Sequence, residues 1–324
     1  MAEFLTFFVL LLDATMRVST PLILAALAGL FAERSGVFDI ALEGKMLAAA
    51  FAAGAVAAVS GSAWLGLLAA IGVSVFFSMV HAYACVTHHG NQVVSGMAIN
   101  ILVAGLGPVV GLVWFGLGGQ TPALADSARF RPIHLPLEET LENVPFLGSA
   151  YSEIISGHNL FVYFAFAAVP ITAWILYRNR FGLRLRAVGE NPEAVDTAGI
   201  SVYAMRYQAL IITGVLCGIA GAFLATAQNA SFIRNMTAGQ GFIALAALIF
   251  GKWRPVPTML ACLLFAFSDA LQVRLQGVDI PGIGVIPVQF VQALPFVLTV
   301  IVLAGFIGSA IPPKAGGQPY IKER

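Results

Sequence analysis

Long apolar stretches without acidic or basic side chains dominate this chain. Asp, Glu, Lys and Arg are missing from residues 46–125, 154–177, 207–233, 235–251 and 280–313. A helix that crosses a lipid bilayer needs roughly 20 mostly apolar residues. The pattern therefore predicts membrane-spanning helices along most of the chain.

Turn-forming residues divide the longest stretch into several helices, with breaks at 60–62, 88–92 and 116–122. We expect one span that begins at Pro21, passes Phe31 and continues towards Asp39, with others near 42–60, 64–86, 93–115, 159–177, 207–227, 257–275 and 288–307. Residues 240–251 supply at most about 18 Å of helix. We expect a short, broken or re-entrant segment there, surrounded by protein or a cavity. Residues 4–17 are either a span or an interfacial helix, so the prediction is an all-α polytopic membrane protein with eight to ten crossings.

The composition supports a membrane protein. Only 10% of the residues are charged, 59% are hydrophobic, and the mean hydropathy is +0.88. A soluble domain carries about 25% charged residues, and a nucleic-acid binder needs a basic surface. These values exclude an ordinary soluble enzyme and a nucleic-acid partner, and they make membrane lipid the expected surroundings. No cleavable leader is evident near residues 4–12, and Cys85, Cys217 and Cys262 are expected to be buried packing residues.

The basic residues predict the orientation, because cytoplasmic loops are enriched in Lys and Arg. Five arginines lie in the loop 178–206, which we therefore place in the cytoplasm. Counting crossings from this loop puts Lys252 and the tail 312–324 inside and the loop 117–157 outside. It also puts the N-terminus outside. We expect one membrane domain, residues 1–311, followed by the cytoplasmic tail.

A short surface helix is expected inside the cytoplasmic loop, where residues 189–199 read GENPEAVDTAG. Asn191 suits the N-cap and Pro192 the first helical position. Glu193 and Asp196 favour the positive end of the helix dipole. Gly199 suits the left-handed conformation after the last turn. A capped helix indicates a docking element for a cytoplasmic partner, although a simple connector is the alternative.

Three segments carry a family resemblance. Residues 193–199 resemble the EAA-type coupling loop of ABC importer permeases, with Val195 replacing the second alanine. Residues 33–46, ERSGVFDIALEGKM, resemble the ERSGVxNIxLEGxM signature of the simple-sugar/nucleoside branch of the branched-chain amino acid/ribose permease family. Residues 241–253, GFIALAALIFGKW, resemble the GxGFxxIAxAxxG block of that branch. The likeness extends over about 14–308. Two positions depart from the branch: Asp39 stands where Asn is usual, and Lys45 where an apolar residue is usual.

The resemblance implies a type II-like permease fold in a bacterial plasma (inner) membrane. It implies a heterodimer with a second, longer permease, of which this chain is the shorter. It also implies ABC ATPase subunits that use ATP and Mg, and an extracytoplasmic solute-binding protein. The residues that it assigns to ATPase coupling are Glu190, Asn191, Pro192, Glu193, Ala194, Asp196 and Gly199. The signature residues are Ser35, Gly36, Asp39, Glu43 and Gly44.

Polar residues inside a membrane are costly and often functional. Asp39 and Glu43 either line a break in the first helices or lie solvated at an interfacial turn. Amide side chains suit the hydroxyls and bases of polar solutes. Candidate path residues are Asn100, the deepest, with Asn91, Gln92, Gln228 and Asn229. For Asn100 an interhelical hydrogen bond is the alternative. The adjacent His88 and His89 lack a third ligand, so we expect no metal site.

Missing motifs restrict the mechanism. The sequence contains no G-x-x-x-x-G-K-[ST], H-E-x-x-H or G-x-S-x-G segment. We therefore expect no catalytic residue and no cofactor on this chain. The preferred function is an ATP-driven importer subunit for a nucleoside or related solute. The alternatives are the same machinery importing a sugar such as ribose, an ion-coupled secondary transporter, and an intramembrane enzyme, which no nucleophile–base pair supports.

Overall fold

The computed structural model describes residues 2–135, 151–152, 156–276, 279–280, 284–285, 289, 293, 297, 300 and 310–322. Within these residues, seven helices are long and apolar enough to cross a membrane. The expected all-α polytopic fold is confirmed. The span expected near 288–307 lies almost entirely outside the described residues.

The spanning helices match the hydropathy pattern closely. They are α1 (Ala2–Arg34), α2 (Leu42–Ser60), α3 (Ala63–Ala82) continued by η1 (Tyr83–Thr87), α4 (Gln92–Phe115), α7 (Leu160–Arg178), α10 (Val202–Phe223) continued by η4 (Leu224–Gln228), and α12 (Pro255–Leu275). The shorter elements are η2 (Asp126–Ala128), α8 (Arg180–Glu190), α9 (Pro192–Thr197), α11 (Gln240–Phe250), β1 (Asp279–Ile280) and β2 (Gly284–Val285), and the two strands pair antiparallel.

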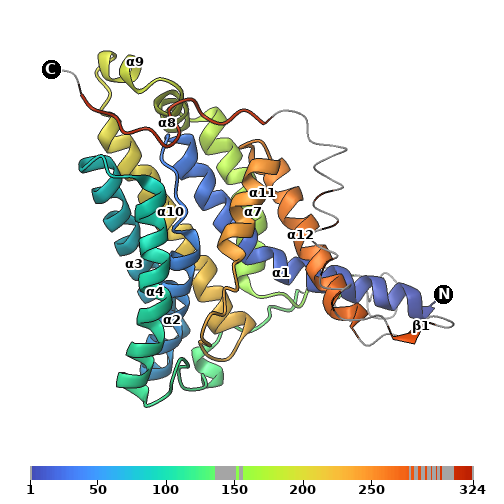
Figure 1. The fold of residues 1–324 in the computed structure, drawn as a ribbon. Helices are drawn as coiled ribbons and strands as arrows, with labels where there is room; N and C mark the ends of the chain where they lie inside the picture. Colours follow the sequence, from blue (N-terminus) through green and yellow to red (C-terminus); the bar gives the residue numbers. More distant parts are fainter. Residues whose placement is uncertain are drawn as a thin grey trace.

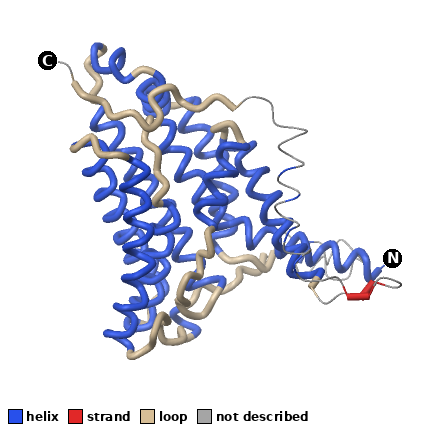
Figure 2. The backbone as a smooth tube through the Cα atoms, viewed as in Figure 1, coloured by secondary structure: helices blue, strands red, loops and turns tan. Residues whose placement is uncertain are grey.

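The first helix differs from the expectation. The two proposed segments, 4–17 and the span from Pro21, form one 33-residue helix, which ends at Arg34 and not near Asp39. Figures 1 and 2 show that α1 is bent, and its N-terminal part runs away from the helix bundle. Pro21 lies inside the helix and cannot donate a backbone hydrogen bond to the preceding turn, which is a common cause of such a bend.

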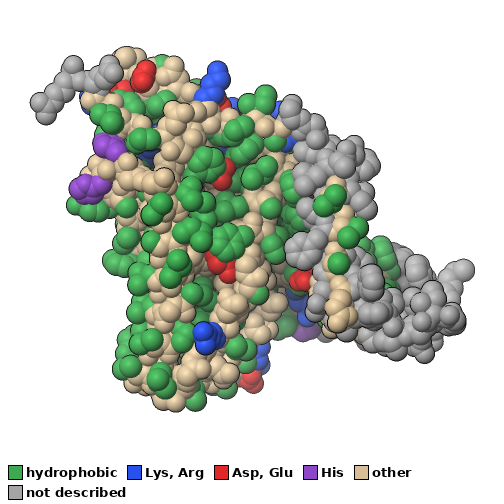
Figure 3. Space-filling model, in the orientation of Figure 1, with side chains coloured by type: hydrophobic (Ala, Val, Ile, Leu, Met, Phe, Trp, Pro, Cys, Tyr) green, Lys and Arg blue, Asp and Glu red, His purple; other side chains and the backbone are tan. Residues whose placement is uncertain are grey.

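Helices α1, α2 and α10 form the centre of the bundle, and α3, α4, α7 and α12 surround them (Figure 1). The rest of the molecule buries 72% of the α2 window and 78% of the α10 window, but only 28% of α4 and α12. Outward-facing apolar residues include Ile101, Val113 and Trp174. Figure 3 shows hydrophobic side chains spread over the visible face, as expected for a surface in contact with lipid.

Glycines in α10 allow this close packing. A Cβ atom added to Gly214 would lie 2.7 Å from the Cα of Val75, and one at Gly218 would lie 2.6 Å from the Cα of Ile71, both in α3. Gly221 makes the same kind of approach to α2, where the nearest side-chain atom, the Cβ of Ala49, would be 2.6 Å away. Small residues at the contacts between membrane helices allow the helix backbones to approach closely, as they do here.

The two ends of the bundle differ. Helices α8 and α9 and the C-terminal tail lie together at one end (Figure 1), which the arginine-rich connection predicts to be cytoplasmic. At the opposite end, which the sequence predicts to be the outer one, residues 121–130 lie against η4 and the segment that follows it. The backbone of Thr121 bonds to Phe232, Leu124 to Ala230 and Phe130 to Thr226. The part of the 117–157 loop at 136–150 and 153–155 lies outside the described residues.

Candidate functional site

The connection 178–206, which the sequence predicts to be cytoplasmic, contains the expected short helix, α9. The Asn191 side chain accepts a hydrogen bond from the Ala194 amide at 3.1 Å, and Pro192 occupies the first turn. Gly199 follows the helix with φ +76°, a conformation that glycine adopts without strain. Glu193 and Ala194 are exposed, whereas Val195 is buried. The helix therefore presents a polar face outward and is anchored by one apolar residue.

A second helix, α8, precedes α9 and is missing from the sequence-based expectation. It buries Leu185 and Val188 and exposes its basic residues Arg180 and Arg184. Near its end, the backbone of Gly189 packs on the end of α1. A Cβ atom at Gly189 would lie 3.0 Å from the carbonyl carbon of Arg34. The connection 178–206 thus lies directly against the start of the signature segment 33–46.

The described part of the C-terminal tail, residues 312–322, holds α8 and α9 in place. The Ala315 amide donates to the Gly189 carbonyl at 2.9 Å, and the Gly317 amide donates to the Gly36 carbonyl at 3.2 Å. Lys322 pairs with Asp196 at 3.4 Å. The tail therefore connects the candidate coupling helices to the end of α1.

Tyr203 and Tyr320 also join the C-terminal tail to α10. The Tyr203 hydroxyl donates to the backbone carbonyl of Tyr320 at 3.3 Å. Burial, a hydrogen bond with Asp196 and the charge of that carboxylate raise the pKa of Tyr320. Its hydroxyl therefore stays protonated beside Asp196.

Arg206 of α10 joins the end of α1 to the C-terminal tail, although the sequence places it among the five arginines of the loop 178–206. The side chain is only 1% exposed. Its guanidinium donates to the carbonyls of Ser35 and Gln318, each at 3.3 Å. A buried cation that binds backbone carbonyls fixes the turn at Ser35–Gly36 against the tail.

Asp39 and Lys45 form a fully buried ion pair. Asp39 lies in the non-helical segment between α1 and α2, and Lys45 lies in the first turns of α2. His81 of α3 lies 4.0 Å from the Asp39 carboxylate and bonds to the Phe38 carbonyl at 3.0 Å. The interpretation of a solvated interfacial turn at Asp39 is therefore wrong, because all three side chains are inaccessible to solvent.

The amides at the start of α4 hold the signature segment. Asn100 accepts a hydrogen bond from the Gly44 amide at 2.8 Å and donates to the Ile40 carbonyl at 3.0 Å. Gln92 accepts from the Phe38 amide at 2.6 Å. For Asn100 the structure favours the interhelical hydrogen bond. Asn91 caps α4 by accepting from the Val93 and Val94 amides.

Glu43 binds the N-terminus of the short helix α11. Its carboxylate accepts hydrogen bonds from the Thr237 hydroxyl at 2.5 Å, from the Gly239 amide at 2.8 Å and from the Gly241 amide at 2.7 Å. The free backbone amides and the dipole at a helix N-terminus favour an anion. Two helices, α2 and α11, therefore begin beside each other inside the protein, joined by one carboxylate.

The opposite end of α11 is attached to α1. The Trp253 indole donates to Glu33 at 2.5 Å, and Arg34 donates to the Trp253 carbonyl at 2.7 Å. Arg34 thus binds the turn after α11 and not the carboxylates of Asp39 or Glu43. Both ends of α11 are held by residues of the signature segment.

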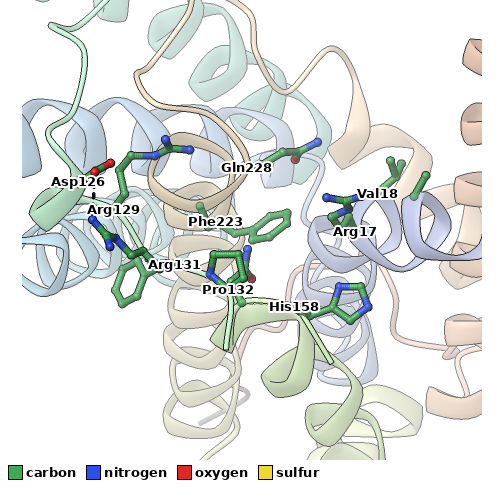
Figure 4. Close-up of a pocket in the computed structure, with 14 residues that line it drawn as sticks. Arg17, Val18, Asp126, Arg129, Arg131, Pro132, His158, Phe223 and Gln228 are labelled. Carbon is green, nitrogen blue, oxygen red and sulfur yellow. Dashed lines mark ion pairs between the residues drawn. The ribbon is translucent and has the colours of Figure 1, made fainter. Parts of the chain in front are cut away.

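The remaining path candidates lie at the outer end. Asn229 donates to the Leu224 carbonyl at 3.0 Å and closes the end of η4. Gln228 lines a cavity of about 500 Å³, shown in Figure 4. The cavity lies between α1, the end of α10 with η4, and the segments 126–132 and 157–159. The structure therefore separates the five amides: Asn91, Gln92 and Asn100 lie with α4, and Gln228 and Asn229 lie near the outer end.

Several residues of this network went unnoticed in the sequence. His81 is the only ionisable side chain of α3, and a polar residue in an apolar helix is a usable signal. Trp253 and the tail residues gave no local signal, because their partners are more than 100 residues away.

Comparisons with known proteins agree with the resemblance. The profile of the family described as branched-chain amino acid transport system / permease component matches residues 11–303. The nucleoside ABC transporter permease protein NupC of Lactococcus lactis subsp. cremoris is 41% identical over 313 residues, which cover 94% of this chain and 95% of the relative. The guanosine ABC transporter permease protein NupQ of Bacillus subtilis is 39% identical over 320 residues, covering 97% of each.

Two further relatives bear on cargo and assembly. TsgC13 of Haloferax volcanii, whose name provisionally assigns it to glucose transport, is 35% identical over 91% of this chain and 90% of its own length. The guanosine ABC transporter permease protein NupP of Bacillus subtilis is 29% identical over 77% of this chain and 70% of its own length. Bacillus subtilis thus has two guanosine permeases, and this chain is more similar to NupQ than to NupP.

Proposed function

The chain belongs to the branched-chain amino acid transport system / permease component family, and we propose that it is the membrane-spanning subunit of an ATP-driven importer for nucleosides in a bacterial inner membrane. The similarity to two nucleoside permeases over nearly the whole chain carries this proposal. The seven helices of the described residues that are long and apolar enough to cross a membrane, and the lack of a Walker A segment, agree with a transport subunit that takes its energy from a partner.

The proposed assembly contains a second permease. NupQ and NupP of one organism are both named guanosine permeases, and this chain is 39% identical to the first but 29% identical to the second. We therefore expect a heterodimer in which this chain takes the NupQ position. ABC ATPase subunits that bind ATP and Mg would dock on α9, and an extracytoplasmic solute-binding protein would deliver the nucleoside.

The mechanism that we propose begins at the exposed face of α9. Closure of the ATPase subunits would move α8 and α9, which contact Arg34 and Gly36 through Gly189 and the C-terminal tail. The signature segment continues from this contact to Glu43 and the start of α11. Rigid packed elements can transfer such a displacement to the centre of the membrane, where alternating access requires a rearrangement.

Uptake assays test the proposed function. Cells with and without this gene would be given labelled guanosine, adenosine, uridine, ribose or glucose, before and after ATP depletion at a maintained proton gradient. We expect gene-dependent nucleoside uptake that stops when ATP is depleted. Uptake of a sugar alone would overturn the nucleoside assignment but keep the ATP-driven mechanism. Uptake that survives ATP depletion would contradict the importer and favour ion coupling.

A paired substitution tests the coupling helix. Glu193→Lys reverses an exposed charge at the positive end of α9, and Gly199→Pro is incompatible with φ +76° at that position. We expect the double variant to lose nucleoside uptake while it still inserts into the membrane at a normal level. Ser60→Ala, at the exposed last residue of α2, is the control. Normal uptake by the double variant would remove α9 from the coupling mechanism.

A further inference from the structure

The outer cavity contains three arginines, of which two are paired. Arg17 pairs with Asp13 of α1, and Arg131 pairs with Asp126 at 3.0 Å. Arg129 makes no hydrogen bond or ion pair with another side chain in the described part of the chain, and its Nε atom is buried without a partner there. Figure 4 shows the Arg129 side chain on one side of the cavity and Arg17 and His158 on the other.

Two residues with amide side chains, Asn159 and Gln228, also line this cavity. The Oδ1 atom of Asn159 is buried and has no partner among the described residues. Asn159 precedes α7 but its side chain does not cap that helix. Gln228 is exposed at the cavity wall. Arg129, Asn159 and Gln228 line one cavity, and a guanidinium together with two amides can offer a ligand both donors and acceptors.

The base of the cavity is apolar. Val18 and Ala227 line it, together with Phe130, which stacks edge-on against Phe161 at a centroid distance of 4.8 Å. Phe161 contacts Phe223 in turn, at 5.9 Å, so the wall behind the cavity is a packed aromatic cluster. A volume of about 500 Å³ with an apolar base and a few convergent polar groups is typical of a small-molecule site.

We propose that this outer cavity binds a purine nucleoside before translocation, with the base against Phe130 and its acceptors on Arg129. This assignment rests on the proposed function, because it names where that cargo is first held. A guanidinium binds the adjacent carbonyl and ring nitrogen acceptors of guanine in a bidentate way, and amides pair with the ring edge of adenine. Asn159 and Gln228 supply amides for the remaining base or ribose groups.

A thiol-protection experiment tests occupancy without requiring transport. The complete transporter, in right-side-out membrane vesicles, would carry Ala227→Cys in the cavity. The control would be Ala123→Cys, an exposed position that does not line it. The three native cysteines are buried. We expect guanosine to slow labelling of the Ala227→Cys thiol by a membrane-impermeant methanethiosulfonate, to leave the Ala123→Cys thiol unaffected, and to lose its effect when Arg129→Ala is added.

Comparing several ligands shows which chemical group the cavity recognises. Guanosine, guanosine 5′-monophosphate, ribose and inorganic phosphate would be compared at equal concentration. Protection by inorganic phosphate would overturn the proposal in favour of an anion site, and equal protection by ribose would overturn recognition of the base. No protection by guanosine would show that the cavity does not hold the nucleoside, even if ATP-driven nucleoside uptake is normal.

Uptake by variants gives a second readout. Arg129→Ala should reduce guanosine uptake at low concentration about tenfold, since a bidentate contact with a base is worth about one order of magnitude in affinity. The matched control is Arg234→Ala, an exposed arginine outside the cavity. Equal uptake by the two variants would contradict the assignment of Arg129. If unsubstituted transporter imports no nucleoside, the proposed function fails, while the protection assay still decides what the cavity binds.

Discussion

Asp39 and Lys45 are the two positions at which this chain departs from the signature of its branch, and the structure makes them partners. The ion pair between them is fully buried. Where the branch usually has Asn and an apolar residue, neither charge is present. The two departures therefore compensate each other, because a buried charge without a partner of opposite sign would strongly destabilise the folded protein. From the sequence alone they are two separate differences.

Single and double substitutions test whether Asp39 and Lys45 stabilise the protein as a pair. Asp39→Asn leaves Lys45 unpaired and Lys45→Met leaves Asp39 unpaired, so each should destabilise the protein by about 3–5 kcal/mol. The double variant, which restores the usual residues of the branch, should recover to within about 1 kcal/mol. Thermal unfolding in detergent and the yield of inserted protein measure the effect. Additive losses in the double variant would contradict the pairing.

At the scale of single elements, the short helix α11 depends on contacts at both of its ends. The eleven residues of α11 are too few to cross a bilayer alone, at about 1.5 Å per residue. The helix is stable inside the protein because its start is satisfied by Glu43 and its end is held by Glu33 and Arg34. The sequence predicted a short or broken segment here. It did not show that the signature segment supplies the contacts at both ends.

Glu43→Gln tests this attachment. The amide keeps the size of the side chain but directs one NH2 group towards backbone amides, which are also donors, and it removes the charge that the dipole of α11 favours. We expect a loss of about 1–3 kcal/mol and impaired uptake. Asp126→Asn, which removes an ion pair between largely exposed side chains, is the stability control and should change little. If the two variants unfold at the same temperature, Glu43 does not stabilise α11.

Across the whole molecule, the C-terminal tail connects segments far apart in the sequence. Residues 315–318 contact Gly36, Gly189 and Arg206. Truncation after Ile311 removes these hydrogen bonds and leaves the Arg206 guanidinium without the Gln318 carbonyl. We expect normal membrane insertion but reduced ATP-driven uptake, because α8 and α9 are no longer held against the end of α1.

The matched control is Lys322→Ala. It removes only the pair with Asp196, in which the lysine is 62% exposed. An exposed pair of this kind contributes little, so uptake should stay close to normal. A truncated chain that transports as well as the full chain would show that the tail has no part in coupling.

The sequence by itself predicted most of the spanning helices, but not α8 and not the continuity of α1. The expected spans 42–60 and 257–275 agree with α2 and α12 to within two residues, because a bilayer requires long apolar segments and the turn residues between them interrupt each run. The cap of α9 was equally readable, since Asn191, Pro192 and Gly199 act on their own neighbours. Features that depend on neighbouring residues can therefore be predicted from the sequence.

Only the tertiary structure decided what the polar residues inside the bundle do. The amides of Asn100 and Gln92 suggested a solute path, yet they bind the backbone of the signature segment. Glu43 meets amides nearly 200 residues away, and Arg206 is buried although its neighbours in the loop are exposed. The partner of a buried polar group depends on which helices pack together, and that choice is a property of the whole chain.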